Sequence, residues 1–402
     1  MTGLKVDSNS AATEVITLSE SGNRISVKNG FDYSYDVLFT EEDIFSTDSQ
    51  LLHDVMDRHR CLVVVSETVN KLYGSKIADY FRRPSGNETF RILPLHISEN
   101  IKNMETVMRI CKEGKRFGLD RKSLFIAIGG GVLMDTVGLA SSIYMRKLNF
   151  VRIPTTLVGQ VDAGIGLKTG VDFEGRKNFI GSFHPPICVL NDFRFLRTLN
   201  AEEIRNGLAE IVKMAIISDS ELFSALETNS KRIVNCYMSG SDTTFTQWIN
   251  LTAARRMLEQ LQANPYEKEL ERLVDLGHTF SPFIEMYTRH SIKHGRAVAI
   301  DIAISTEIAC LIGRIDTQLH DRILSMLAAL GFNLHDVKAF EAERMWQSLD
   351  SIILRRGGKL NLVIPTGIGT AGFLREAEEL EKDILKQAMA NLCKFQSGGH
   401  LK

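Results

Sequence analysis

Residues 123–146, SLFIAIGGGVLMDTVGLASSIYMR, decide the fold class of this chain. The segment reads as an apolar strand, then three glycines (Gly129, Gly130 and Gly131), and then a helix. Such a turn lets backbone N–H groups and a helix N-terminus approach a pyrophosphate closely. It is not G-x-G-x-x-G, however, and a tight strand-to-helix turn without a ligand fits it as well. The segment predicts a βαβ arrangement and leaves dinucleotide binding open.

Short β-rich runs alternate with helical stretches from about residue 60 to 195, which predicts a parallel sheet with crossover helices. The runs are RCLVVVSE (60–67), TFRILPLHI (89–97), SLFIAIGGG (123–131), NFVRIPTT (149–156) and ICVLND (187–192). From about residue 200 the period becomes 3.6 residues, as in 201–217, 248–264 and 295–313. We expect an α/β domain over 1–195 and a helical domain over 196–402, with residues 358–374 as a hairpin or loop.

The composition excludes several classes of partner. The 402 residues are 44% hydrophobic with a net charge of −1, so the basic surplus that nucleic acid or anionic membranes require is absent. No apolar run reaches the roughly 18 residues of a membrane span, and the polar N-terminus does not resemble a signal peptide. Six cysteines without C-x-x-C spacing are expected as reduced thiols. We expect a cytoplasmic protein with a small-molecule partner.

A glycine-rich stretch, RIPTTLVGQVDAGIGLKTGVDFEGRKN (152–178), holds many polar side chains in short loops. Lysines and an asparagine held by such a backbone suit a phosphorylated substrate, although a solvated loop is also possible. The polar residues are Thr155, Thr156, Asp162, Lys168, Lys177 and Asn178.

Three residues could form a metal site: Glu210 in NGLAEIVKMAI, His278 in DLGHTF and His294 in IKHGRAVAI. Each is expected in a helix or at its start, and Pro282 in a helix's first turn. Two imidazoles and one carboxylate make a zinc-type site with an open coordination position. A lone histidine is more often a core or surface residue, and spacing alone cannot show that the three converge.

Five ordered stretches resemble the dehydroquinate synthase-like sugar phosphate cyclases, and the similarity extends from about residue 60 to 365. They are GGGVLMDTVGLA (129–140), IPTTLVGQVDAGIGLKTGVDFEGRKNFIGSFHPP (153–186), RNGLAEIVK (205–213), LGHTFSP (276–282) and KHGRAVAID (293–301). The resemblance implies an N-terminal Rossmann-like NAD-binding domain, a C-terminal all-helical metal-binding domain, an active site between them, and a homodimer.

The resemblance also implies roles for individual residues. The ligands of a divalent metal, zinc or cobalt, would be Glu210, His278 and His294. The NAD-binding set would be Glu99, Lys102, Gly130, Gly131, Asp135, Thr155, Thr156, Asp162 and Lys177. The catalytic or substrate-facing set would be Lys168, Lys213, Asp275, Asn178, Arg146, Arg255 and Lys359. Ser66 departs from the family pattern, which often has an aspartate there for the adenosine ribose.

The implied reaction is a cyclisation that releases phosphate. A hydroxyl is oxidised transiently by NAD beside the metal, and the resulting ketone acidifies the neighbouring C–H. Phosphate then leaves by β-elimination, with the phosphate itself as the base. Return of the hydride, ring opening and an intramolecular aldol step complete the carbocycle, so that no net redox change results.

Residues around His278 indicate which substrate is used. Dehydroquinate synthases have Arg seven residues before this histidine, Asn three before and His four after, whereas this chain has Glu271, Asp275 and Pro282. Two acids would repel the carboxylate of a keto acid by about 1–4 kcal/mol, although Arg272 could offset this. A neutral polyol end suits them better, which favours sedoheptulose 7-phosphate as substrate.

Finer features address the product and the remaining alternatives. Asp275 with KTGV (168–171) favours a valiolone-forming cyclase, with 2-epi-5-epi-valiolone as the expected product. Arg355, where a histidine is expected, and Asp172, where an asparagine is expected, leave 2-epi-valiolone open. A dehydroquinate synthase and a metal-dependent polyol dehydrogenase are further alternatives. An uncharged polyol would leave Lys168, Lys177 and Lys213 unpaired, which argues against the dehydrogenase.

Overall fold

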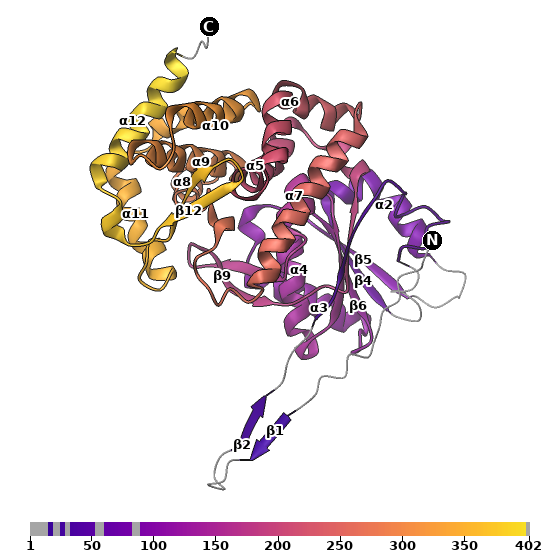
Figure 1. Cartoon of the computed structure of the whole chain (residues 1–402). Coiled ribbons are helices and arrows are strands. Elements are labelled where there is room, and N and C mark those ends of the chain that lie inside the picture. Colours follow the sequence, from indigo (N-terminus) through magenta and orange to yellow (C-terminus); the bar gives the residue numbers. More distant parts are fainter. Residues whose placement is uncertain (1–14, 19–24, 29–32, 53–59, 83–88, 399–402) are drawn as a thin grey trace. The chain divides into compact units, whose positions relative to one another are not determined.

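The computed structural model of the chain describes residues 15–18, 25–28, 33–52, 60–82 and 89–398 (Figure 1). They form two compact units. Unit 1 contains the described residues up to Ile153, together with Leu167–Glu174 and Asn178–Asp192. Unit 2 contains Pro154–Gly166, Gly175–Lys177 and the described residues from Phe193 onward. The chain therefore passes between the units several times, and a single domain boundary at residue 195 stays a prediction.

A six-stranded sheet in the order β3-β10-β7-β6-β4-β5 forms the centre of unit 1. Its strands are β3 (Asp36–Thr40), β4 (Cys61–Ser66), β5 (Phe90–Leu95), β6 (Leu124–Gly129), β7 (Asn149–Pro154) and β10 (Cys188–Asp192). The pairs β4–β5, β4–β6, β10–β7 and β10–β3 are all parallel. Every residue of β4 and β6 is buried, which explains their continuous apolar sequences. The five strands predicted from the sequence are confirmed, and β3 is an addition.

Helices α2 (Glu67–Phe81), α3 (Met104–Phe117) and α4 (Gly131–Ile143) connect these strands, with short 3-10 turns η1 (Glu99–Ile101) and η2 (Tyr144–Arg146). The side chain of Asn103 accepts the N–H of Thr106 at the start of α3. The core of this unit packs α3 and α4 against the sheet. Its fully buried members include Leu62, Val64, Ile110, Phe125 and Val137.

The carboxyl ends of β4 and β6 form the switch point of the sheet. The chain leaves β4 for β5 on one side and returns to β6 on the other, and ligands of open α/β sheets bind where the direction reverses. Gly129 ends β6 there. A Cβ on Gly129 would lie 2.7 Å from Leu133 Cδ2 and 3.5 Å from Ser66 Cβ. Glycine here leaves room for the Leu133 side chain and is not needed for a left-handed backbone, since its φ is not positive.

Residues 168–183 form a hairpin, β8 (Lys168–Phe173) and β9 (Arg176–Phe183), where the sequence suggested glycine-rich loops. Glycines allow the two strands to approach, since a Cβ on Gly181 would lie 2.4 Å from the carbonyl oxygen of Thr169. A second hairpin, β1 (Val15–Leu18) with β2 (Ile25–Lys28), is antiparallel. Alternation over so few residues is too weak a signal to predict either one.

Unit 2 is mainly helical. Its helices are α5 (Ala201–Ser218), α6 (Ser220–Ser239), α7 (Thr243–Ala263), α8 (Ser281–Tyr287), α9 (His294–Leu311), α10 (Thr317–Ala329), α11 (Ala342–Arg355) and α12 (Lys382–Gly398). Short turns are η3 (Gly159–Ala163), η4 (Phe193–Thr198), η5 (Leu273–Asp275), η6 (Leu334–Ala339) and η7 (Ala377–Glu379). The predicted exception is confirmed as a hairpin, β11 (Leu362–Gly367) with β12 (Thr370–Leu374). The expected α/β fold with a helical C-terminal part is therefore confirmed.

Helix α9 is the central element of unit 2. It packs against α5, α8, α10, α12 and β11, and almost all of its residues are buried. A mostly apolar helix is expected in such a position, and the charged residues Asp301 and Glu307 are exceptions. Within the part of the chain that the structure describes, no helix combines the length and hydropathy that crossing a membrane requires. All six cysteines are free thiols, and Cys61, Cys188 and Cys236 are buried.

The contact between His320 on α10 and Glu307 on α9 gives stability a pH dependence. His320 Nε2 lies 2.9 Å from Glu307 Oε1, and Nδ1 lies 2.8 Å from Asp321 Oδ1. Burial alone would lower the pKa of His320, but these two carboxylates raise it above its ordinary value of 6.5. The stabilisation is therefore complete below pH 6.5 and is lost as the pH rises through the folded-state pKa.

We expect His320→Gln to lower the free energy of unfolding most at acidic pH, with the difference from wild type shrinking as the pH rises. Urea unfolding between about pH 5.5 and 8.5 measures this. If the difference in unfolding free energy between wild type and His320→Gln does not change with pH, protonation of His320 is not the source of the stabilisation.

Candidate active site

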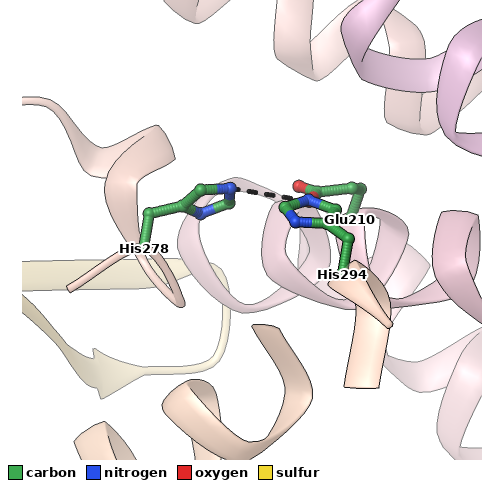
Figure 2. A group of neighbouring side chains, drawn as sticks. All are labelled: Glu210, His278 and His294. Atoms are coloured by element: carbon green, nitrogen blue, oxygen red, sulfur yellow. Dashed lines mark hydrogen bonds and ion pairs between the residues drawn. The ribbon is translucent and has the colours of Figure 1, made fainter. Parts of the chain in front are cut away.

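Glu210, His278 and His294 meet at one point in unit 2 (Figure 2). Glu210 lies in the middle of α5, His294 is the first residue of α9, and His278 lies between η5 and α8. One ligand atom from each lies within 4.8 Å of the others. The Glu210 side chain is fully buried, whereas those of His278 and His294 are 29% and 36% exposed. The predicted metal triad is thus brought together, buried on the carboxylate side and partly exposed at the imidazoles.

Close packing of α5 against α9 brings His294 to Glu210. A Cβ on Gly295 would lie 2.3 Å from Asn206 Cα, so the residue after His294 must be glycine for the two backbones to touch. The N–H of Gly295 also donates to Asn206 Oδ1 at 3.1 Å. Because Asn206 and Glu210 are four residues apart on the same face of α5, this contact brings His294, next to Gly295, to within 3.0 Å of the Glu210 carboxylate.

His278 lies in a turn, and the expectation that it lies in or at the start of a helix is wrong. Gly277 has a φ of 78°, and a Cβ there would lie 2.9 Å from Val298 Cγ1, so the chain turns sharply before α8. Asp301 Oδ2 on α9 then accepts the N–H groups of Phe280 and Ser281 at 2.5 and 2.8 Å. This carboxylate satisfies backbone donors at the start of α8. Pro282 lies in the first turn of α8, as predicted.

The hydrogen bonds of His278 leave its second nitrogen available to a cation. Nδ1 lies 3.1 Å from the carbonyl oxygen of Leu276, to which it donates, and Nε2 lies 3.7 Å from Glu210 Oε1. Burial lowers the pKa of His278 to about 4, although Glu210 acts in the opposite direction. The imidazole is therefore neutral at physiological pH, with a lone pair on Nε2. This is the form in which histidine binds metals.

Glu210 is ionised although it is fully buried. Burial alone would raise its pKa, but Lys213 and the two histidines hold it well below the ordinary value. Lys213 Nζ lies 2.5 Å from Glu210 Oε2 and 3.4 Å from Asp162 Oδ2. Burial would lower the pKa of Lys213, but Asp162 and Glu210 raise it. Lys213 is thus a charged donor and not a base.

His294 lies between two carboxylates. Its Nδ1 is 3.0 Å from Glu285 Oε1, and its Nε2 is 3.0 Å from Glu210 Oε1. Burial would lower the pKa of His294, but Glu285 and Glu210 raise it to about 10. A divalent cation between Nε2 and Glu210 would supply the positive charge that this second proton supplies. One carboxylate and two imidazoles are also the donors that zinc or cobalt accepts, so the residues fit such an ion.

The chain matches two family models of known proteins. Residues 92–206 match the 3-dehydroquinate synthase N-terminal domain family, and residues 207–351 match the 3-dehydroquinate synthase C-terminal domain family. The chain belongs to the dehydroquinate synthase-like cyclases. It is 37% identical to a 2-epi-5-epi-valiolone synthase of Streptomyces glaucescens, over 96% of this chain and 97% of that protein. With the enzyme of the same name from Streptomyces albus it shares 41% identity, over 82% and 81% of the two chains.

A solved structure from Streptomyces hygroscopicus subsp. jinggangensis 5008 has the same fold. That 2-epi-5-epi-valiolone synthase contains NAD+ and Zn2+ and is 36% identical to this chain. The superposition has a TM-score of 0.85 and covers 92% of this chain and 99% of that one. The resemblance derived from the five sequence stretches is confirmed, and the chain is an enzyme of this cyclase family.

Asp275 is surrounded by arginines. Arg272 contacts Asp275 Oδ1, and Arg356 lies 3.5 Å from Oδ2. Glu271 is a surface residue whose two oxygens lie 2.9 and 3.0 Å from Arg375. The expectation that Glu271 and Asp275 together repel a substrate carboxylate is therefore wrong, because arginines neutralise both charges. Asp275 stays a candidate acceptor of a hydrogen bond from a substrate hydroxyl, a role that a carboxylate can take.

Two other members of the predicted catalytic set lie on the surface of unit 2. The Arg255 side chain on α7 is 79% exposed and lies 3.7 Å from Glu259. Lys359, before β11, is 51% exposed and lies 3.4 Å from Glu376. Neither belongs to the buried charge network around Glu210, and their catalytic roles stay predictions.

The first cofactor-binding candidates of unit 2 lie where β7 leads into η3. Thr155 is buried, and Thr156 Oγ1 accepts the N–H of Gly159 at 3.2 Å. Asp162 follows within η3, a single π-helical turn of a kind common at functional sites. Lys177, the remaining candidate here, lies 2.7 Å from Glu285 Oε2.

In unit 1 the candidates gather around Lys102. Its ammonium lies 2.7 Å from Asp135 Oδ2 on α4 and donates to Asn178 Oδ1 at 2.5 Å. Burial would lower the pKa of Lys102, but Asp135, and then Glu99, raise it. Asp172 Oδ1 accepts the N–H of Asn178, whose φ is 52°, at 2.8 Å. An asparagine oxygen could accept the same bond, so the departure at Asp172 has no consequence for this turn.

The glycine turn lies at the switch point of this unit. Gly130 is the N-cap residue of α4 and has no side chain with which to cap the N-terminal N–H groups of the helix. Ser66 accepts the N–H of Val69 at 3.3 Å and caps α2, a role that aspartate could also take. Lys168 at the start of β8 and Arg146 after α4 are both exposed, and Arg146 has a φ of 76°.

Sequence reasoning missed three charged residues of unit 2 that the structure brings next to the site: Glu285, Asp301 and Arg356. The sequence did contain a signal for the two acids. Each lies within an apolar helical run, where a charged residue is rare unless it has a partner. No comparable signal marked Arg356, which lies in a charged stretch.

Proposed function

We propose that the chain is a sedoheptulose 7-phosphate cyclase that releases phosphate and forms 2-epi-5-epi-valiolone. The observation that carries this proposal is the convergence of Glu210, His278 and His294 in a chain that is 37% identical, over 96% of its length, to a 2-epi-5-epi-valiolone synthase. The proposed cofactors are NAD and one divalent metal ion, zinc or cobalt. Glu210 Oε1 and the Nε2 atoms of His278 and His294 would bind the metal.

Bound NAD would supply reversible hydride acceptance, and the metal Lewis acidity at the same substrate hydroxyl. Lys213 would donate a hydrogen bond to a substrate oxygen beside the triad, because Asp162 and Glu210 keep it charged. A charged lysine cannot take the proton of the C–H bond, which agrees with the substrate's own phosphate as the base. Asp275, held by Arg272 and Arg356, would accept a hydroxyl of the polyol end.

The NAD-binding proposal rests on unit 1. The glycines before α4, the absence of a capping side chain at Gly130 and their position at the switch point together suit a pyrophosphate. Gly130, Gly131, Asp135 and the Glu99 and Lys102 turn would line this site. Lys168 and Asn178, on the β8–β9 hairpin, would face the substrate phosphate.

One assay tests the function. The protein is incubated with sedoheptulose 7-phosphate, NAD and Zn2+ or Co2+, released phosphate is measured, and the cyclitol is identified by NMR. We expect phosphate release without accumulation of NADH, and 2-epi-5-epi-valiolone as the product. A 2-epi-valiolone product would revise the proposed stereochemistry and agree with the departures at Arg355 and Asp172. Accumulated NADH, or dehydroquinate formed from the keto-acid phosphate, would overturn the assignment.

We further propose that the working form is a cytoplasmic homodimer with no nucleic acid or membrane partner. The family resemblance supports the dimer, to which Arg146 would contribute from one protomer to the other. Six free thiols support a reducing compartment. Light scattering after size-exclusion chromatography measures the mass in solution.

A further inference from the structure

Glu285 on α8 uses its two carboxylate oxygens on two different candidate residues. Oε1 lies 3.0 Å from His294 Nδ1, and Oε2 lies 2.7 Å from Lys177 Nζ. The Glu285 side chain is 5% exposed, that of Lys177 18% and that of His294 36%. A carboxylate in such a place is costly unless its partners compensate it. These two contacts do so, and His290 Nδ1 lies 4.0 Å from Oε2 as well.

The position of Glu285 is fixed from both ends of α8. Asp301 holds the N–H groups of Phe280 and Ser281 at the start, and the C=O of Glu285 itself accepts the N–H of His290 at 2.8 Å. The carboxylate therefore stands on a short, anchored helix. An anchored carboxylate can fix the direction of an imidazole, whereas a mobile carboxylate could not hold His294 in a single orientation.

A hydrogen bond to Nδ1 decides which nitrogen of His294 is left for a metal. When Nδ1–H donates to a carboxylate, the lone pair is on Nε2, which faces Glu210 Oε1 at 3.0 Å. The negative charge of the acceptor also makes Nε2 a better donor to a cation. Glu285 does this without lying among the three ligand atoms themselves.

We propose that Glu285 is a positioning residue that sets the tautomer and direction of His294 and at the same time holds Lys177 beside it. The inference rests on the proposed metal site and names a residue that acts through the ligand. It also makes one carboxylate common to the metal site and a cofactor-binding candidate. Loss of the Glu285 charge would lower the affinity for the metal and would also remove the ion pair that holds Lys177.

The first test measures metal affinity without the reaction. Apo protein is titrated with Co2+ and the d–d absorption is recorded for wild type, Glu285→Gln, Glu285→Ala and Glu307→Gln. We expect Glu285→Gln to lower the affinity for Co2+ about 10–100-fold, the usual effect of losing a carboxylate that is hydrogen-bonded to a metal ligand. Glu285→Ala should lower it further. The matched control is Glu307→Gln, which alters another buried glutamate beside a histidine, His320, and should leave Co2+ affinity unchanged.

The second test addresses Lys177. Dissociation constants for NAD are measured for Glu285→Ala, Lys177→Met and the double variant. If Glu285 acts on NAD binding through Lys177, each single variant raises the dissociation constant for NAD. The double variant then raises it no further than the single variant with the larger effect. Additive effects would overturn the shared role, because the residues would then act independently.

The outcomes separate this inference from the function itself. If Glu285→Gln binds Co2+ as tightly as wild type, while the thermal stabilities of Glu285→Gln and Glu307→Gln fall alike, the residue is merely structural and the inference is overturned. The proposed cyclase function would be unaffected by that result. If wild type itself binds no Co2+, the metal assignment and this inference fall together.

Discussion

Replacing Glu210 with alanine is expected to lower phosphate release from sedoheptulose 7-phosphate by about 10²–10⁴-fold, because Lewis-acid stabilisation contributes several kcal/mol to such reactions. Glu210 is the only carboxylate of the triad and is fully buried. Its removal takes away one candidate metal ligand and the nearest partner of the buried Lys213 ammonium. The readouts are kcat/KM for phosphate release and bound Zn2+ or Co2+ per protomer.

Two further variants make this prediction specific. Glu210→Gln keeps the shape of the side chain and removes its charge, so it should lose metal and activity nearly as completely. Glu307→Gln changes a buried glutamate of α9 that lies beside His320, and it should keep both. Full activity in Glu210→Ala would exclude the triad as the metal site.

Replacing Arg356 with methionine is expected to lower the free energy of unfolding by about 3–5 kcal/mol, the usual cost of leaving a buried polar network without its cation. The Arg356 guanidinium donates to Thr279 Oγ1 at 3.1 Å and to the carbonyl oxygens of Leu360 and Asn361 at 2.8 and 3.1 Å. It also lies 3.5 Å from Asp275 Oδ2. One side chain thus ties the His278 turn to the strand-forming segment after α11.

Urea unfolding of Arg356→Met measures this loss, and Arg375→Met is the matched control. Arg375 makes a two-pronged ion pair with Glu271, but its side chain is 53% exposed, so we expect only a small fraction of the Arg356 effect. Arg356→Lys should recover part of the stability, since lysine keeps the charge and loses the forked geometry. Equal effects of Arg356→Met and Arg375→Met would show that burial does not govern this network.

Local patterns in the sequence were sufficient for five strands of the sheet, and short family motifs named the three candidate metal ligands. The continuous apolar run of 124–129 specified a strand buried on both faces, and the glycines after it specified the turn into α4. Both properties depend on neighbours within a few residues. The hairpins β1–β2 and β8–β9 and the π-helical turn η3 were not predicted, because their geometry depends on close contacts between distant residues, such as Gly181 against Thr169.

The charge state of the site could not be read from residue types. Glu271 and Asp275 looked like an acidic pair, yet Arg375 neutralises one, and Arg272 and Arg356 the other. Arg375 and Arg356 lie 104 and 81 positions along the chain from the acids they pair with. Sequence counting around His278 could not have found them.

What the sequence by itself determined is the alternation of the main strands and helices, the family and the chemical types of the candidate ligands, since these depend on local spacing and on short motifs. The tertiary structure alone decided that Glu210, His278 and His294 meet, that Lys213 stays charged and that Glu285 stands behind His294. The reason is physical. Ionisation and hydrogen-bond direction depend on burial and on distances between side chains, and the packing of α5, α8 and α9 fixes both.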